Sequence, residues 1–325
     1  MINIRVDDFG VIRREKGLNL ILDTDAGSDC DDMMALAYLA YAQKNHLIDI
    51  KCVTYSHVSP DGPAAIRAFF RNIGLAVPPI GQMTHGKAIN DNYCFEIANK
   101  YATEEDRIPA TDAVSVLRKA LTESENAVIC AVGPLTNIAD LMLSQPDEIS
   151  SLNGVELVKA KCSRVIVMAG EFTPEEGKNI KTEWNVLCDI DACRTVASLC
   201  PVPMVWLPWE TGIEMKTGRP LMDKYGEETP VSLAFFKYPW VDADGRHSWD
   251  PATALYSVEG AKDFFLENVG HVTVDEAGIT VLNKNEGGTH TVLTMLSKDG
   301  KTELEVKAEC AAYLDRCAIS AYSDK

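Results

Sequence analysis

The chain has 325 residues, of which 46% are hydrophobic, and a formal net charge of −17 at pH 7. This length and apolar content suit one large folded unit, so we expect a single domain over residues 1–325. The strongly negative charge disfavours contact with nucleic-acid phosphates or with an anionic membrane surface, and we expect neither as a partner.

The ten cysteines stand singly, often inside apolar runs, and none forms a CxxC pair. Such spacing is typical of reduced thiols that pack as small hydrophobic side chains. The N-terminal segment contains no apolar core of the secretory kind, and the chain has no uncharged apolar stretch long enough for a membrane span. We therefore expect a cytoplasmic protein.

Short apolar runs of β type alternate with helical patterns through most of the chain. They predict strands at residues 19–23, 48–55, 77–80, 127–132, 164–169 and 204–207. They predict helices at residues 32–43, 62–72, 112–124, 136–143 and 191–199. This order is typical of an α/β fold with an open, mostly parallel sheet and helices on both faces. Ligands of such folds bind beyond the carboxyl ends of the strands.

The last part of the chain follows a different pattern. Residues 268–310 alternate and turn as antiparallel strands do, and they predict a C-terminal β-ribbon appended to the fold. A final helix is predicted at residues 307–320. No linker rich in proline, glycine or serine divides the chain, which agrees with one domain.

The most informative segment is LILDTDAGSDCDDMMAL at residues 20–36. It joins a predicted strand to a predicted helix and contains five aspartates, Asp23, Asp25, Asp29, Asp31 and Asp32. Like charges this close repel one another unless a cation or the hydroxyls of a ligand compensate them. Oxygen ligands suit hard cations, so the segment predicts a calcium or magnesium site. A solvated acidic turn is the alternative interpretation.

Further polar residues follow other predicted strands. Gly133 and Pro134 end the strand at residues 127–132, and such a turn leaves carbonyl groups free. Glu183 and Asn185 stand two residues apart on one side of an extended segment, where they could bind vicinal hydroxyls. Each of these signals also fits an ordinary turn.

Other candidates are weaker on their own. Asp250 precedes a proline and a helix, where an aspartate is an ordinary helix cap. His57 and His85 fall near the predicted carboxyl ends of strands, and Trp209 follows another strand. Each of these side chains could equally belong to the core or to a site.

Taken together, the motifs resemble the inosine/uridine-preferring nucleoside hydrolase family. The family's opening DxDxG…DD motif corresponds to DTDAG at residues 23–27 and DD at residues 31–32. Its GLTNIA-like turn corresponds to GPLTNIA at residues 133–139, its ExN motif to EWN at residues 183–185, and its late DP pair to residues 250–251. All four occur in the family's order.

The resemblance implies an open α/β sheet with a calcium ion at the carboxyl ends of its strands. By this resemblance, the carboxylates of Asp25, Asp32 and Asp250 and the backbone carbonyl of Val132 would bind calcium. The family's members also suggest a homo-dimer or homo-tetramer.

The same resemblance implies the roles of the remaining motif residues. Asp31, Glu183 and Asn185 would bind the ribose hydroxyls, and Asp25 would be the general base for a calcium-bound water. Cleavage of an N-glycosidic bond builds an oxocarbenium-like ribosyl cation, which nearby carboxylates stabilise. The implied reaction is calcium-dependent hydrolysis of a ribonucleoside, or a related riboside, to the sugar and the free base.

Three departures from the family pattern concern the substrate. The opening motif carries two additional residues, which makes Asp29 an extra carboxylate without an assigned role. The pyrimidine-active members have a histidine before the late aspartate as leaving-group acid, but here Trp249 fills that position and His247 lies two residues earlier. His57 stands where the family has an asparagine.

These departures favour a purine over a pyrimidine as the base. Trp184, Trp209 and Trp249 are candidates for stacking on it, and each could instead be core. A catalytically weak, calcium-dependent nucleoside-binding protein is the main alternative. A phosphatase of the haloacid-dehalogenase type, which also opens with a strand and DxD, is a lesser one.

Overall fold

The computed structural model describes residues 5–6, 12–13, 17–86, 89–173, 178–285, 287–297 and 299–323. Among these residues, ten strands form one sheet in the order β13-β12-β14-β9-β8-β7-β3-β4-β5-β6. The strands are β3 (Leu18–Thr24), β4 (Ile48–Tyr55), β5 (Ile80–Gln82), β6 (Thr111–Asp112), β7 (Ala127–Ala131), β8 (Cys162–Met168), β9 (Met204–Leu207), β12 (Phe265–Val274), β13 (Thr280–Asn283) and β14 (His290–Met295). Two separate antiparallel pairs are β1 (Arg5–Val6) with β2 (Ile12–Arg13) and β10 (Lys216–Gly218) with β11 (Gly245–His247).

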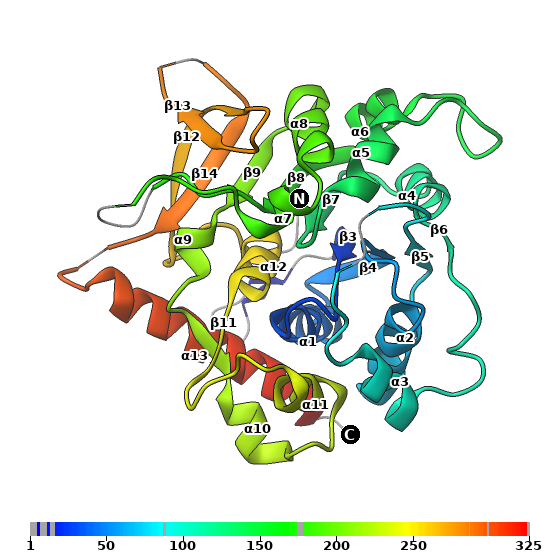
Figure 1. The fold of residues 1–325 in the computed structure, drawn as a ribbon, viewed down its shortest axis with the longest axis vertical. Helices are drawn as coiled ribbons and strands as arrows, with labels where there is room; N and C mark the ends of the chain where they lie inside the picture. The colour runs from blue at the N-terminus through cyan, green and yellow to red at the C-terminus, as the bar shows by residue number, and fades with distance from the viewer. Residues whose placement is uncertain are drawn as a thin grey trace.

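Helices cover both faces of the sheet (Figure 1). One face carries α1 (Asp31–Lys44), α2 (Gly62–Asn72), α12 (Trp249–Glu259) and α13 (Glu303–Ser323). The other carries α4 (Ala113–Thr122), α5 (Thr136–Leu143), α6 (Gly154–Lys161) and α8 (Ile190–Leu199). The remaining helices are α3 (Cys94–Tyr101), α7 (Trp184–Cys188), α9 (Trp209–Gly212), α10 (Arg219–Tyr225) and α11 (Pro230–Lys237).

The central strands contain continuous apolar runs because both of their faces are buried there. In β3, Leu20 and Leu22 pack into the core that contains α1, whereas Ile21 between them packs into the core on the opposite face. All three side chains are fully buried. This arrangement explains why the segment has no polar alternation before Asp23, and it confirms the predicted mostly parallel sheet.

The antiparallel strands expected near the C-terminus are confirmed, and they join the main sheet. β12 pairs with β13 and β14 in antiparallel fashion, as predicted, but β14 also pairs with β9 in parallel. The three strands therefore extend the main sheet instead of standing beside it. Helix α13 begins at Glu303, so the last residues of the predicted ribbon are helical.

One strand and several short elements were not predicted correctly. The strand expected at residues 77–80 is β5, at Ile80–Gln82, since two prolines that lack N–H groups precede it. Helices α3, α6 and α9 to α11 lie in segments whose apolar periodicity is short or interrupted.

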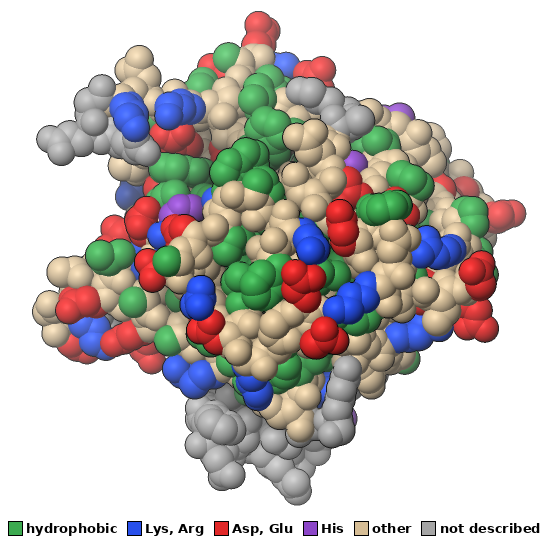
Figure 2. All heavy atoms as spheres, turned by 60° about the horizontal axis from the view of Figure 1, so that its bottom comes forward, with side chains coloured by type: hydrophobic (Ala, Val, Ile, Leu, Met, Phe, Trp, Pro, Cys, Tyr) green, Lys and Arg blue, Asp and Glu red, His purple; other side chains and the backbone are tan. Residues whose placement is uncertain are grey.

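Among the described residues, no helix combines the length and the apolar character needed to cross a lipid bilayer. All ten cysteines lie among the described residues, and none of them forms a disulfide bond. On the face shown in Figure 2, acidic and basic side chains are interspersed with small apolar areas, and no continuous basic patch is visible there.

Candidate active site

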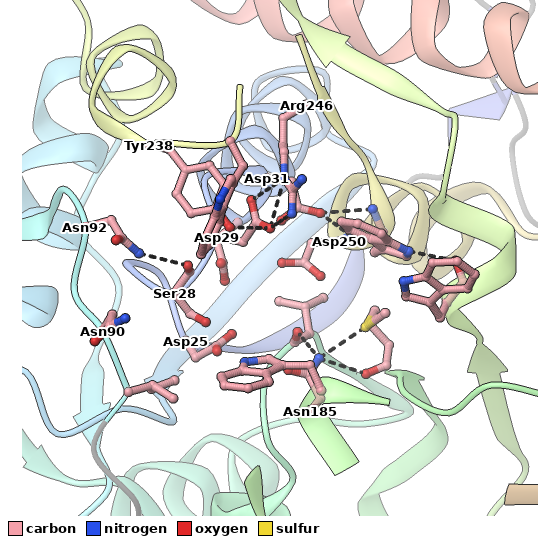
Figure 3. A pocket seen from close by; sticks show the side chains of 18 of the residues that line it. Asp25, Ser28, Asp29, Asp31, Asn90, Asn92, Asn185, Tyr238, Arg246 and Asp250 are labelled. Carbon is pink, nitrogen blue, oxygen red and sulfur yellow. Dashed lines mark hydrogen bonds and ion pairs between the residues drawn. The ribbon is translucent and has the colours of Figure 1, made fainter. Parts of the chain in front are cut away.

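A pocket of about 480 Å³ opens beyond the carboxyl ends of β3, β7 and β8, and it collects most of the motif residues (Figure 3). Segments after these three strands meet the start of α12 there. The lining residues are Asp25, Ser28, Asp29, Asp31, Asp32, Ile89, Asn90, Asn92, Val132, Met168, Glu183, Trp184, Asn185, Trp209, Tyr238, Trp240, Arg246, Trp249 and Asp250.

Three carboxylates at the floor of the pocket form a tight cluster. Asp31, Asp32 and Asp250 each offer an oxygen within 4.8 Å of the others, and all three side chains are buried. Burial, and then the charges of neighbouring carboxylates, raise the pKa of Asp32 and Asp250 well above the usual value. An all-oxygen set of this kind fits a hard divalent cation, whose charge would remove the repulsion.

Asp31 also connects the acidic loop after β3 to the start of α12. Its Oδ2 accepts the backbone N–H groups of Trp249 and Asp250, at 2.9 and 3.1 Å. These are the first residues of α12, so the carboxylate compensates the positive end of that helix. The proximity of Asp31 and Asp250 is therefore built into the fold.

Asp25 lines the same pocket but lies outside the tight cluster. Its carboxylate packs against Gly133, where an added Cβ would lie 2.7 Å from Asp25 Oδ1 and 2.6 Å from Ser56 Oγ. These close contacts leave no room for a side chain, which explains why residue 133 is a glycine. Burial raises the pKa of Asp25 to about 7 when no cation is bound.

The ExN residues come from the start of α7. Glu183 caps this helix, and its carboxylate accepts the backbone N–H groups of Asn185 and Val186 at 2.9 and 3.3 Å. Burial raises the pKa of Glu183 to about 7. The amide nitrogen of Asn185 donates to the carbonyl oxygens of Val132 and Met168, at 2.9 and 3.1 Å.

Asp23 lies beneath the site and does not line the pocket. It is fully buried at the end of β3, where one oxygen accepts hydrogen bonds from Thr54 Oγ1 and from Asn137 Nδ2 at 2.5 and 2.8 Å. Burial raises its pKa to about 6. Because Asn137 belongs to the GPLTNIA turn, Asp23 connects this turn to β3 and β4.

Three histidines considered from the sequence lie outside the residues that line the pocket. His57 is buried, with its Nδ1 accepting the Ser59 N–H and its Nε2 donating to the Ile89 carbonyl at 2.7 Å. His85 contacts Asp140 at 2.7 Å on the surface. His247 accepts the backbone N–H of Glu214. Neither His57 nor His85, both considered as substrate contacts, is therefore among the residues that line this pocket.

Aromatic rings form much of the remaining wall. Trp184, Trp209, Trp240 and Trp249 all line the pocket, together with Tyr238. Trp184 and Trp240 are exposed at 53% and 64%, whereas Trp249 is buried and donates from its indole nitrogen to the Trp209 carbonyl. Tyr238 and Trp240 were not selected from the sequence, although both stand shortly before the late aspartate motif.

The extra aspartate of the opening motif, Asp29, has a defined partner. Arg246 in β11 forms a salt bridge with its carboxylate, and Tyr238 donates its hydroxyl to the same group at 2.9 Å. The backbone N–H of Cys30 also donates to it, at 2.7 Å. Arg246 was not anticipated, but an arginine four residues before Asp250 was visible in the sequence.

The comparison with known families agrees with this geometry. The family described as inosine-uridine preferring nucleoside hydrolase matches residues 20–315. The chain belongs to this family. The resemblance inferred from the motifs is thereby confirmed, and membership of the nucleoside hydrolase family supports a hydrolase. It leaves the phosphatase alternative without support.

Solved structures with a similar fold include a nucleoside hydrolase and two effector proteins. An inosine-uridine preferring nucleoside hydrolase from Bacillus anthracis has a TM-score of 0.62 and 14% identity, over 90% of this chain and 99% of that one. The effector XOO4466 has a TM-score of 0.64 and 15% identity, over 93% and 95% of the two chains. The type III effector XopQ, solved with adenosine diphosphate ribose, has the same score and identity, over 95% and 96%. No curated protein matches the chain significantly.

Proposed function

We propose that this protein hydrolyses the N-glycosidic bond of a ribonucleoside and releases ribose and a free base, with purine ribosides preferred. The observation that carries the proposal is the convergence of Asp25, Asp31, Asp32, Glu183 and Asp250 in one aromatic-walled pocket. Several carboxylates in one pocket stabilise the positive charge that develops on the sugar during this reaction.

We assign a calcium ion to Asp25, Asp32, Asp250 and the carbonyl oxygen of Val132. The support is the buried, all-oxygen cluster in which Asp32 and Asp250 lie close together, and the charge of Asp25, which raises the pKa of both. When bound, such an ion supplies positive charge that orients hydroxyls and acidifies a nearby water.

Side chains of the protein accept the proton and bind the ribose hydroxyls. Asp25 accepts the proton of the attacking water from its place in the pocket beside the acidic cluster. Asp31 uses Oδ2 to hold α12 and has its other oxygen for a ribose hydroxyl. The amide nitrogen of Asn185 donates to the carbonyl oxygens of Val132 and Met168, so its own carbonyl oxygen is left to accept from a ribose hydroxyl. Glu183 accepts from a further ribose hydroxyl.

The wall of the pocket supports a purine. Tryptophan rings give a flat base a large stacking surface, and Trp184 is half-exposed at the rim, where a base could reach it. The ADP-ribose in the XopQ structure also supports a riboside as ligand, because that ligand contains a purine riboside.

The test is release of reducing sugar from a panel of purine and pyrimidine ribonucleosides, with calcium and with a chelator. We expect calcium-dependent release from at least one purine riboside and weaker release from uridine. Activity that survives chelation would contradict the metal assignment, and activity on no riboside would contradict the hydrolase.

One observation favours a second candidate, a calcium-dependent riboside-binding protein with little turnover. None of the described residues that line the pocket is a histidine, so the leaving-group acid of the pyrimidine-active members has no counterpart there. Calorimetric binding of a nucleoside in calcium, without sugar release over hours, would identify this candidate.

A further inference from the structure

Arg246 is the basic residue among the described residues that line the pocket, against six acidic ones. Its side chain is only 15% exposed, and that of its partner Asp29 is 21% exposed. Burial of a guanidinium in an active site costs free energy unless its donors are used. The buried position of Arg246 therefore indicates that its N–H donors have partners, in the protein or in a ligand.

Asp29 occupies one edge of the guanidinium. Arg246 Nε lies 3.0 Å from both carboxylate oxygens of Asp29, and Nη2 donates to Oδ2. Tyr238 and the backbone of Cys30 donate to the same carboxylate and hold it in place. The salt bridge consequently fixes the orientation of the Arg246 plane.

Two aromatic rings restrict the guanidinium further. Its Cζ atom lies 5.1 Å from the centroid of the Tyr238 ring and 5.2 Å from that of Trp249. Arginine stacks on aromatic faces through cation–π contacts, which leave its in-plane N–H groups available. Figure 3 shows Arg246 and Tyr238 above Asp29 and Asp31, on the side of the pocket opposite Asp25 and Asn185.

The second edge of the guanidinium is left for a ligand. Among the described residues, no hydrogen bond uses Nη1, and Nη2 donates only to Asp29. The free edge therefore presents one N–H from each terminal nitrogen, a fork that matches two neighbouring acceptors. Because Arg246 lines the pocket, a bound ligand can reach these donors.

The charge of the pocket selects the kind of acceptor. Asp29 already neutralises Arg246, and the remaining carboxylates make the pocket negative, so an anionic group would gain little there. A neutral carbonyl beside a ring nitrogen fits better. Oxygen O6 and nitrogen N7 of a 6-oxopurine form such a pair, whereas a 6-aminopurine presents an N–H donor where Arg246 also donates.

We propose that Arg246 binds the leaving base at this edge and sets a preference for 6-oxopurine ribosides, with Asp29 as its positioning residue. The inference rests on the proposed hydrolase function. As the C1′–N9 bond breaks, its electron pair stays with the base, and the donors of Arg246 stabilise the density that spreads to O6 and N7. Water supplies the hydroxyl at C1′ and, through solvent, the proton that the base takes up.

The test compares inosine with adenosine as substrates of Arg246→Lys, Arg246→Gln and Asp29→Asn. Arg246→Lys keeps the charge and removes the fork. We expect kcat/KM for inosine to fall about 10- to 100-fold in both Arg246 variants, and that for adenosine to fall less than about threefold, since a bidentate contact discriminates on this scale. Asp29→Asn should change the ratio in the same direction by a smaller factor. The matched control is Arg219→Lys, at an exposed salt bridge with Asp223.

A second measurement does not depend on turnover. Inhibition or calorimetric binding by free hypoxanthine should weaken in the Arg246 variants, while binding of adenine should not. An unchanged inosine-to-adenosine ratio, or equal losses for both bases, would overturn the role of Arg246 and leave the hydrolase function standing. If the parent protein cleaves no riboside, the proposed function fails, and the binding of hypoxanthine still decides the role of Arg246.

Discussion

Asp31 Oδ2 accepts the backbone N–H of Asp250 at 3.1 Å across 219 residues of sequence. This bond fixes the loop after β3 to the start of α12, so two buried carboxylates are held close whether or not a cation is present. The hydrogen bond thus holds Asp31 and Asp250 together against the repulsion between their carboxylates. Such a conflict between local charge repulsion and the fold is typical of functional sites.

Asp250→Asn should stabilise the protein in chelator and abolish its response to calcium. The substitution keeps the shape of the side chain and removes a buried like charge. At pH 8 the gain should be about 1.4 kcal/mol or more, the free energy of one pKa unit. Denaturant unfolding with and without calcium measures both effects. A less stable variant that still gains stability from calcium would contradict the assignment.

The calcium-free protein should lose stability as the pH rises from about 4.5 to about 7. Burial raises the pKa of Glu183 to about 7 and that of Asp23 to about 6, so the folded state holds protons that the unfolded state has already released. Stability therefore falls through this window. Urea titrations in chelator at pH 5 and pH 7.5 measure the change. Glu183→Gln should flatten the dependence, and a parent protein that is more stable at pH 7.5 would contradict it.

Gly133→Ala should reduce activity strongly, because the added Cβ would meet Asp25 Oδ1 at 2.7 Å and Ser56 Oγ at 2.6 Å. We expect a loss of about 100-fold in kcat/KM, on the scale known for small displacements of catalytic groups. Gly287→Ala is the control, since nothing lies within 4 Å of its added Cβ. Equal activity of the two variants would contradict the expectation that the added Cβ displaces Asp25.

Trp184→Ala should raise KM for purine ribosides about tenfold, within the range of base–aromatic stacking, with little change in the melting temperature. The ring is 53% exposed, so its removal leaves no cavity in the core. Leu187→Ala is the control, at a residue of the same helix that is 45% exposed and does not line the pocket. An unchanged KM would show that the base does not reach Trp184.

The sheet and the acidic motif could be predicted from the sequence because their signals are local. Leu20, Ile21 and Leu22 form a continuous apolar run that ends in carboxylates, which marks a buried parallel strand and the edge where ligands bind. The family motifs then placed Asp25, Asp32, Glu183 and similar residues in order. The structure brings these residues to one pocket.

The remainder of the site depends on contacts between distant segments. The partner of Asp29 is 217 residues away in β11, a three-residue strand without a sequence signal of its own. His57 fell near a strand end as a ligand would, but its ring turns to the backbone of Ser59 and Ile89. Neither outcome follows from spacing, since both depend on how loops fold over the sheet.

The central claim is tested most directly by following inosine by proton NMR with the calcium-loaded protein and with Asp25→Asn. We expect stoichiometric formation of ribose and hypoxanthine by the parent protein, and a rate at least about 1,000-fold lower for the variant, since the variant lacks the group that accepts the proton. Inosine that stays intact with the parent protein, or an Asp25→Asn variant with full activity, would contradict this claim.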